Sequence, residues 1–369
     1  MLTTAPNITQ LTIKFPNHQY PIYIAADLLL NSTLLQQQVL SEQILIVTND
    51  TVAPLYLDKI KHAFSAFQCD IVVLPDGETH KNEHSLFMIY DALISHHHHR
   101  DTTLFALGGG VIGDITGFAA ATYQRGVRFV QLPTTLLAQV DSAVGGKTGV
   151  NYAQAKNMIG SFYQPHAVIM DLSTLATLPE RELRAGFAEI IKYGLLVGGS
   201  FLQHLVEDGL QCYGLADVVA QCCQIKANFV QRDEREHGQR ALLNLGHTFA
   251  HALEAITDYG RWLHGEAVAI GLYCAALLSF HLGYLSQSDV DLLDSLLMNA
   301  KLPNRIPRDI DLQAVYRLMW NDKKIKNKQL PFVIIRSFGD CILEKQITPK
   351  QVDFVLQSAV ESTTITGKV

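Results

Sequence analysis

Hydrophobic and polar positions follow two different patterns along this chain. Up to about residue 178, short β-branched or apolar runs alternate with stretches of helical period, and turn signals separate them. Helical stretches such as 86–94 lie between several of these runs, which is typical of βα units with a mostly parallel sheet. The runs that predict strands are 44–48, 71–74, 102–107, 129–132 and 167–170.

The second half is patterned for helices. No proline occurs between Pro179 and Pro303, and apolar residues recur at helical spacing, which over 242–253 predicts one continuous helix. We therefore expect an α/β domain with a mostly parallel sheet over 1–178 and an α-helical domain over 179–369.

Composition narrows the class of protein. The chain has 369 residues, of which 48% are hydrophobic and 17% charged, so it has the material for large cores and too little charge for disorder. With 29 Lys and Arg against 35 Asp and Glu, the net charge is −6, which argues against a nucleic-acid partner. The six cysteines lack C-x-x-C spacing and predict reduced thiols.

Membrane signals are also missing from the sequence. The longest apolar run, 267–280, has 14 residues, whereas about 20 are needed to span a bilayer. The N-terminal segment has no apolar stretch of the secretory kind. We expect a cytoplasmic protein with no membrane partner.

A run of four histidines at 96–99 is compatible with a metal site or with a solvated loop. It lies between the expected helix 86–94 and the expected strand 102–107. This position between two elements favours the solvated loop.

A glycine turn at 108–114 follows a predicted strand, opens a helix and has the spacing G-x-G-x-x-G. Glycines let the backbone approach a pyrophosphate, and the N–H groups of a helix start attract it. A tight turn without a ligand is the alternative, but the strand–turn–helix context favours a nucleotide site. No acidic residue ends the next strand, at 131–135, so the ribose of a dinucleotide would be held in a variant way.

A second glycine loop, at 141–148, is similar to the end of a P-loop. Asp141 stands at the first glycine position, where a carboxylate would repel phosphate, so an ATPase or GTPase is not expected. Lys147, Lys156 and Asn157 bring two cations and an amide together in the sequence. A site for an anion and solvated surface lysines both remain open.

Four polar residues would share one face of the expected helix. At 100° per residue they fall within a stripe about 60° wide. Their side chains coordinate metals and bind anions, whereas a solvated face would favour Lys and Glu; such a face remains the alternative. The four are Arg240, Asn244, His247 and His251.

Glu189 lies in an otherwise apolar helix with Lys192 one turn later, and a buried Glu needs a partner. His264, at the head of an apolar helix, alone would be a cap or a core residue. One Glu, two His and an open position form the ligand set of a catalytic zinc site, although spacing does not prove that the residues meet.

Together, in this order, the motifs resemble those of 3-dehydroquinate synthases. The resemblance extends over nearly the whole chain, from 76 to 324. One departure is Ala250, where the family usually has Gly; a methyl group there should tighten packing without removing a ligand. The motifs are the glycine turn 108–114, the loop 145–148 with Lys156 and Asn157, and the segments 188–194, 244–249, 264–266 and 322–324.

The resemblance implies a Rossmann-like N-terminal domain, an all-helical C-terminal domain, an active site in the cleft between them, and a homodimer. It implies a lyase of the shikimate pathway that converts 3-deoxy-D-arabino-heptulosonate 7-phosphate to 3-dehydroquinate and phosphate. NAD would oxidise a ring hydroxyl transiently, phosphate would leave by β-elimination, and reduction, ring opening and an intramolecular aldol step would follow.

The resemblance also implies roles for individual residues. Zinc or cobalt would be held by Glu189, His247 and His264. NAD would contact Asp76, Gly77, Glu78, Thr79, His80, Lys81, Gly110, Val111, Ile112, Gly113, Asp114, Thr134, Thr135, Lys147, Lys156, Thr174, Leu175, Ala176 and Thr177. Catalysis would involve Lys147, Lys192, Arg240, Asn244 and His251. Substrate would contact Asp141, Asn157, Lys226, Lys323 or Lys324, and Arg125 of a neighbouring subunit.

Three alternatives remain at this point. A sister sugar-phosphate cyclase would differ at few positions, although the cations suited to both a carboxylate and a phosphate favour the dehydroquinate reaction. A metal- and NAD-dependent polyol dehydrogenase would have no use for phosphate-binding residues such as Lys147, Lys156 and Lys226. A nucleotide-binding module without activity leaves the stripe that contains His247 and His251 unexplained.

Overall fold

The computed structural model describes residues 8–16, 18–153, 155–207, 209, 214–320 and 330–361. The chain forms two compact units, and each is discontinuous in sequence. The first unit contains 1–183 and 213–235, and the second contains 184–212 and 236–369.

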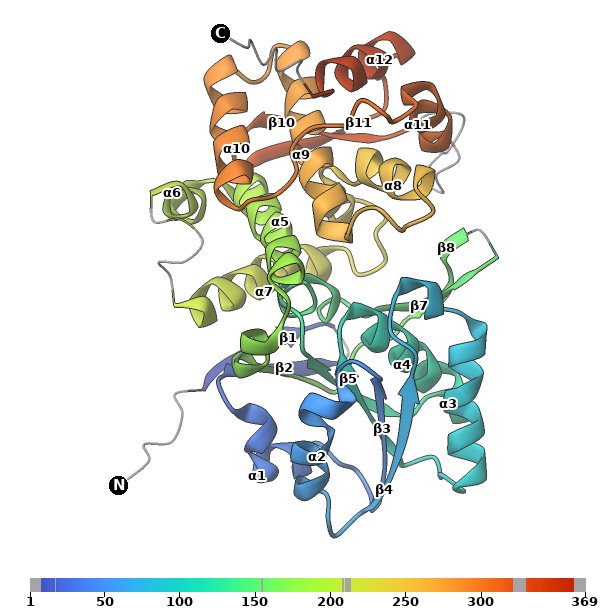
Figure 1. Cartoon of the computed structure of the whole chain (residues 1–369). Helices are drawn as coiled ribbons and strands as arrows, with labels where there is room; N and C mark the ends of the chain where they lie inside the picture. The colour runs from blue at the N-terminus through green and yellow to red at the C-terminus, as the bar shows by residue number, and fades with distance from the viewer. Residues whose placement is uncertain are drawn as a thin grey trace, which may run out of the picture. The chain divides into compact units, whose positions relative to one another are not determined.

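Within the described residues, seven strands of the first unit form one sheet in the order β1-β2-β9-β6-β5-β3-β4 (Figure 1). Only the β1–β2 pair is antiparallel. All five strands expected from the sequence are present, and the mostly parallel sheet is confirmed. The strands are β1 (Thr9–Lys14), β2 (Gln19–Ala25), β3 (Gln43–Asn49), β4 (Gln68–Leu74), β5 (Thr103–Gly108), β6 (Arg128–Pro133) and β9 (Ala167–Asp171).

Helices cover both faces of this sheet. Along β3, Ile44 and Ile46 join a core cluster with α2, whereas Leu45 and Val47 join a cluster with α3 and α4. This alternation follows from the period of two in a strand, and burial on both faces gives continuous apolar runs. The helices are η1 (Leu28–Leu30), α1 (Ser32–Gln36) and α2 (Ala53–Ala63) on one face, and α3 (Glu83–Ser95) and α4 (Gly110–Thr122) on the other.

Helix α7 (Leu215–Arg232) belongs to the first unit, although the sequence predicted a single division near residue 178. It packs on β1 and on the turn η4 (Ala138–Ser142), and the Cys223 Sγ lies 3.3 Å from the Gln139 carbonyl oxygen. The first unit also contains η2 (Glu78–His80), η3 (Tyr123–Arg125), the antiparallel hairpin of β7 (Lys147–Tyr152) and β8 (Ala155–Phe162), and η5 (Leu172–Thr177).

The second unit is built around α9, which is buried over most of 267–279 and packs against α8, α10, α12 and β10. An antiparallel hairpin of β10 and β11 makes the unit mainly rather than wholly helical, which the sequence did not predict. Its elements are α5 (Glu180–Val197), which begins in the first unit, α6 (Gly199–Glu207), η6 (Gln239–Asn244), α8 (His247–Ile256), α9 (His264–His281), α10 (Gln287–Asn299), α11 (Leu312–Met319), β10 (Phe332–Ser337), β11 (Asp340–Glu344) and α12 (Pro349–Ser358).

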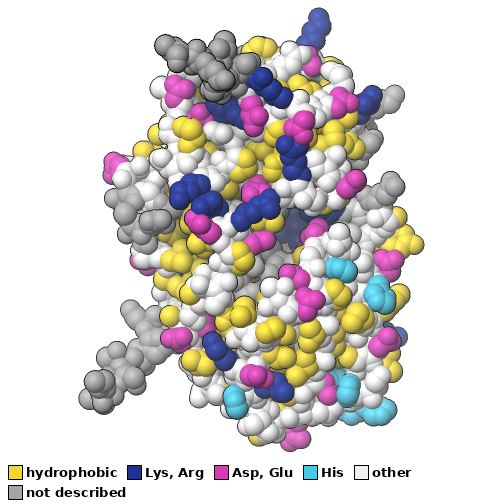
Figure 2. Space-filling view, in the orientation of Figure 1, with side chains coloured by type: hydrophobic (Ala, Val, Ile, Leu, Met, Phe, Trp, Pro, Cys, Tyr) yellow, Lys and Arg dark blue, Asp and Glu magenta, His cyan; other side chains and the backbone are white. Residues whose placement is uncertain are grey.

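The surface shown in Figure 2 mixes acidic and basic side chains, in keeping with the small net charge of −6. Among the described residues, no helix combines the length and the apolar character that crossing a membrane requires.

Candidate functional site

Glycines let three helices of the second unit approach one another closely. A Cβ on Gly265, in the first turn of α9, would lie 1.9 Å from the carbonyl oxygen of Ala185 in α5. A Cβ on Gly271 of α9 would lie 2.2 Å from the carbonyl oxygen of Gly246, which precedes α8. Backbone therefore packs directly on backbone at both crossings, and this brings α5, α8 and α9 together.

Gly246 also interrupts the continuous helix that the sequence predicted over 242–253. Its φ of +78° is left-handed, so η6 ends before it and α8 begins after it. The predicted helical stripe is therefore wrong, and the interruption falls between its second and third members. Arg240 and Asn244 lie in η6, whereas His247 and His251 lie on α8.

Glu189 of α5, His247 of α8 and His264 of α9 place one ligand atom each within 4.8 Å of one another. From Glu189 Oε1, the distance is 3.5 Å to His247 Nε2 and 3.9 Å to His264 Nε2. The Glu189 side chain is fully buried, and neither of its oxygens accepts a hydrogen bond from the described residues. Burying a carboxylate in this way is costly, and a divalent cation at the same point would offset the cost.

Lys192, one turn further along α5, is also buried and forms an ion pair with Glu189. The partner that the sequence required for a buried Glu is thus supplied by the Lys192 ammonium. The pair fixes a positive charge beside the three candidate ligands.

Each of the two histidines is held by its other ring nitrogen. His247 Nδ1 lies 3.1 Å from the Leu245 carbonyl oxygen, and His264 Nδ1 lies 3.3 Å from Glu254 Oε1. Because a carbonyl and a carboxylate only accept, each Nδ1 carries a hydrogen, and each Nε2, on the side of Glu189, is the nitrogen that can coordinate a cation. Metal-binding histidines in proteins are oriented in this way. The residues present therefore fit a divalent cation.

Two residues near the triad were not predicted. Glu254 lies seven residues after His247, and this spacing of two helical turns on one face is a signal that the sequence does contain. Glu236 accepts a hydrogen bond of 2.6 Å from the side-chain amide of Asn244.

Of the other predicted residues of this unit, His251 lies beside both histidines of the triad. The His251 ring centroid is 5.5 Å from that of His247 and 6.3 Å from that of His264. Arg240 is only 1% exposed. Lys323 and Lys324 lie outside the described residues.

In the first unit, the candidate nucleotide-binding segments follow the carboxyl ends of four parallel strands. Asp76 follows β4, the glycine turn follows β5, Thr134 follows β6, and Thr174 follows β9. The next two strands in the chain, β4 and β5, lie on opposite sides of β3 in the sheet. The strand order therefore reverses between β3 and β5. Open α/β sheets bind ligands at such a reversal, outside the carboxyl ends of the strands.

Neighbouring side chains lie so close to the glycine turn 108–114 that two of its glycines leave no room for a Cβ. A Cβ on Gly110 would lie 2.8 Å from Ser142 Oγ, and one on Gly113 would lie 2.5 Å from Gln131 Oε1. Helix α4 begins within the turn, and its first N–H groups have no acceptor within the helix. This arrangement suits the pyrophosphate of a nucleotide.

Lys81 ties two further segments to this turn. Its Nζ lies 2.5 Å from Asp114 Oδ2 and 2.6 Å from Asn157 Oδ1. Burial raises the pKa of Asp114, and the Lys81 ammonium lowers it in opposition. Lys156 Nζ lies 3.6 Å from Glu78 Oε1, so the β7–β8 hairpin lies beside the 76–81 segment.

Two residues that contact these candidate nucleotide-binding segments, Asn49 of β3 and Tyr56 of α2, were missed. Asn49, at the end of β3, donates a hydrogen bond of 2.6 Å to Asp76, and the Tyr56 hydroxyl donates one of 3.1 Å to the Thr174 carbonyl oxygen. Asn49 ends a predicted strand, and this position is the signal by which it could have been found.

The remaining predicted residues of the first unit belong to η3, η4, β7 and α7. Lys226 Nζ forms an ion pair of 2.9 Å with Asp141 Oδ1. Lys147 begins β7 and Arg125 ends η3, and both are exposed.

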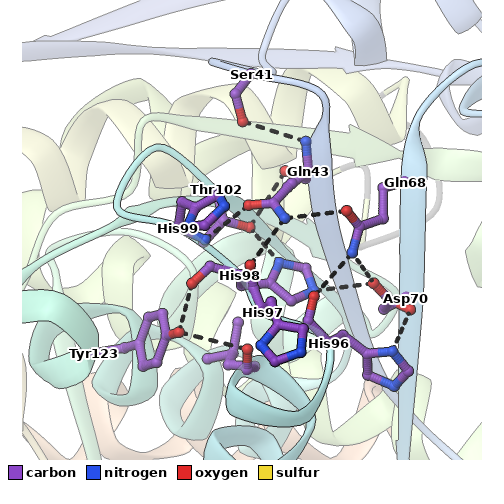
Figure 3. A network of polar contacts seen from close by, with 11 residues as sticks. Ser41, Gln43, Gln68, Asp70, His96, His97, His98, His99, Thr102 and Tyr123 are labelled. Carbon is purple, nitrogen blue, oxygen red and sulfur yellow. Dashed lines mark hydrogen bonds and ion pairs between the residues drawn. The ribbon is translucent and has the colours of Figure 1, made fainter.

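The histidine tract is only in part the solvated loop that the sequence predicted. His96, His97 and His99 are exposed, but the His98 side chain is buried between Asp70 and Thr102, with Nε2 3.1 Å from Asp70 Oδ2 and Nδ1 2.8 Å from Thr102 Oγ1 (Figure 3). Burial lowers the pKa of His98, and Asp70 raises it in opposition. The tract fastens the end of α3 to β3 and β4.

The fold is the one found in the sugar phosphate cyclases. A 2-deoxy-scyllo-inosose synthase solved with carbaglucose-6-phosphate, NAD+ and Co2+ matches with a TM-score of 0.86 and 23% identity, over 95% of this chain and 100% of that chain. ValA, a 2-epi-5-epi-valiolone synthase from Streptomyces hygroscopicus subsp. jinggangensis 5008 with NAD+ and Zn2+ bound, matches with a TM-score of 0.82 and 29% identity, over 92% and 96%.

Sequence comparison then gives the family. Residues 71–185 match the family model of the 3-dehydroquinate synthase N-terminal region, and 186–325 match that of the C-terminal region. A 3-dehydroquinate synthase of Legionella pneumophila (strain Paris) is 57% identical over 357 residues, which cover 95% of this chain and 97% of the relative. The chain belongs to the 3-dehydroquinate synthase family.

Proposed function

We propose that this chain converts 3-deoxy-D-arabino-heptulosonate 7-phosphate to 3-dehydroquinate and phosphate, as a lyase of the shikimate pathway and of aromatic amino acid biosynthesis. The observation that supports this most directly is the buried Glu189 carboxylate facing the Nε2 atoms of two histidines, each of which is held by a hydrogen bond from its Nδ1. The 57% identity to a 3-dehydroquinate synthase over nearly the whole chain supports the choice of reaction.

Two cofactors belong to the proposal. Glu189, His247 and His264 of the second unit would hold zinc or cobalt, and the sheet edge of the first unit would hold NAD. When bound, the cation lowers the pKa of a coordinated hydroxyl, and NAD accepts a hydride and returns it within one turnover. The first unit is therefore proposed as the nucleotide-binding part and the second as the metal-binding part.

The substrate has a carboxylate and a phosphate, and the chain's cations suit both. Arg240 offers a planar guanidinium for bidentate binding of an oxyanion, and Lys192 holds a positive charge beside the ligand set. Asn244 and His251 are proposed to orient the ring hydroxyls. Lys147, exposed at the start of β7, is proposed to supply an ammonium for phosphate.

Further contacts to substrate are proposed for the remaining positions. Lys226 orients Asp141 through their ion pair. Asn157 is held by Lys81 at its side-chain oxygen, which leaves its amide hydrogens for an acceptor.

We also propose a homodimer. Arg125 is exposed in a turn where it and Gln124 have left-handed φ values of 67° and 52°. Such a turn presents an exposed guanidinium, and we propose that it reaches the substrate phosphate of the neighbouring subunit. We assign the reaction to the cytoplasm, with a small sugar-acid phosphate as the ligand.

One assay tests the function. Purified protein is incubated with the heptulosonate phosphate, NAD and Zn2+, and phosphate and NADH are followed together. Phosphate release without NADH accumulation is expected, since the hydride returns to the product. Accumulating NADH would instead indicate a polyol dehydrogenase. Glucose 6-phosphate, which has no carboxylate, is the matched control substrate, and its preferential turnover would indicate a sister cyclase.

A further inference from the structure

Glu254 is an acidic side chain in the interior of the second unit that the proposed reaction does not use. It is 3% exposed and lies near the end of α8, two turns after His247. Its Oε1 is 3.3 Å from His264 Nδ1, so it contacts one candidate metal ligand by the nitrogen that faces away from Glu189.

The two histidines differ in what holds them. His247 Nδ1 donates to a backbone carbonyl, which is neutral and fixed by the turn before α8. His264 Nδ1 donates to a carboxylate, which is charged and fixed by a side chain. The His264 side chain is also the more exposed, at 29% against 10% for His247, so packing restrains it less. His264 therefore depends more on its hydrogen-bond partner than His247 does.

We propose that Glu254 is a positioning residue for the metal centre. It fixes the tautomer of His264 and directs Nε2 towards Glu189. Its negative charge, next to Nδ1, also makes Nε2 a stronger electron-pair donor to the metal ion. The inference rests on the proposed function in one respect, that Glu189, His247 and His264 bind a divalent cation.

The test uses full-length protein freed of metal and reloaded with Co2+, whose visible absorption reports the ligands directly and without any turnover. Zn2+ affinity is measured separately by competition with a chromophoric chelator. Glu254→Ala removes the acceptor and should weaken Zn2+ binding about 10- to 100-fold. It should also change the Co2+ spectrum. Glu254→Gln keeps an acceptor oxygen without the charge, so its loss should be smaller and its spectrum closer to wild type.

Glu266→Gln is the matched control. Glu266 lies in the first turn of α9 and accepts a hydrogen bond of 2.9 Å from the Leu263 N–H, which secures the start of the helix. Its Zn2+ affinity and Co2+ spectrum should stay near wild type. Circular dichroism of each metal-free variant checks folding, and Glu254→Gln carries the test if Glu254→Ala does not fold.

Three results would count against the proposed role of Glu254 or against the function on which it rests. Wild-type affinity and an unchanged spectrum in the folded Glu254 variants would overturn the role of Glu254 alone. Equal losses in Glu254→Gln and Glu266→Gln would overturn it as well, because they would trace the effect to helix packing. A wild-type protein that binds neither Co2+ nor Zn2+ would overturn the proposed function itself.

Discussion

Gly265→Ala should separate α9 from α5 and damage the metal centre without touching a ligand. The added Cβ would lie 1.9 Å from the Ala185 carbonyl oxygen, whereas ordinary contact begins at 3.4 Å, so the shortfall is 3.4 − 1.9 = 1.5 Å. The obstructing atoms belong to backbone and have no rotamer through which to move aside. Metal–ligand distances tolerate only about 0.2 Å, so a helix shift of that order would disrupt coordination.

The energetic consequence can be estimated. Overpacking costs about 1–3 kcal/mol, and a backbone obstacle belongs at the upper end of this range. Alanine in place of glycine within a helix recovers up to about 1 kcal/mol, so we expect a net loss of about 2 kcal/mol in stability. Zn2+ affinity should fall more than tenfold, because two of the three ligands, Glu189 and His264, are on the two displaced helices.

Calorimetry of the metal-free protein and chelator competition for Zn2+ measure the two effects. Gly260→Ala is the matched control, since its Cβ would meet its nearest atom, the Thr257 carbonyl oxygen, at 3.6 Å. We expect this variant to unfold and bind metal as wild type does. A Gly265→Ala protein with wild-type unfolding temperature and metal affinity would show that the close crossing of α5 and α9 does not hold the centre together.

Three other predictions concern residues in both units. His264→Ala should abolish phosphate release and leave NAD binding by calorimetric titration largely intact, because the proposed NAD residues belong to the other unit; equal loss of both would mark His264 as structural. Lys147→Ala should raise KM or lower kcat, and unchanged kinetics would remove Lys147 from the site. At about pH 8, Cys223 and Cys274 of the native protein should react slowly with a thiol reagent, with the labelled peptides identified by mass spectrometry, since burial raises the pKa of both thiols to about 12 and disfavours the thiolate. Reactivity should rise with pH and on unfolding, and fast labelling of these two thiols in the native state would contradict their burial.

The central strands of the sheet could be predicted because each is buried on both faces. β3 and β5 are continuous apolar runs between turn signals, which leaves little alternative to a strand. β1 alternates exposed and buried positions, and β10 lies in the half of the chain whose pattern predicts helices. Neither segment was therefore recognised as a strand. Local sequence lacks the pairing partners that make these segments strands.

The sequence also predicts only part of the candidate metal site. The family motifs led to Glu189, His247 and His264, and the fold brings these three together. The helix expected through Gly246 failed because leucines keep helical spacing across the interruption, and only the contact of Gly246 with α9 reveals the turn. The carbonyl that holds His247 has no side-chain signature, so no sequence pattern could have revealed it.

The discontinuous make-up of the two units has a practical consequence. The chain passes from one unit to the other after residues 183, 212 and 235, so no single cut yields both units whole. A fragment beginning at 184 would include α7 without β1 and η4, and would expose residues such as Cys222 and Cys223 that are fully covered in the intact chain. Such a fragment should aggregate unless α7 is removed and the ends at 212 and 236 are rejoined by a short polar linker.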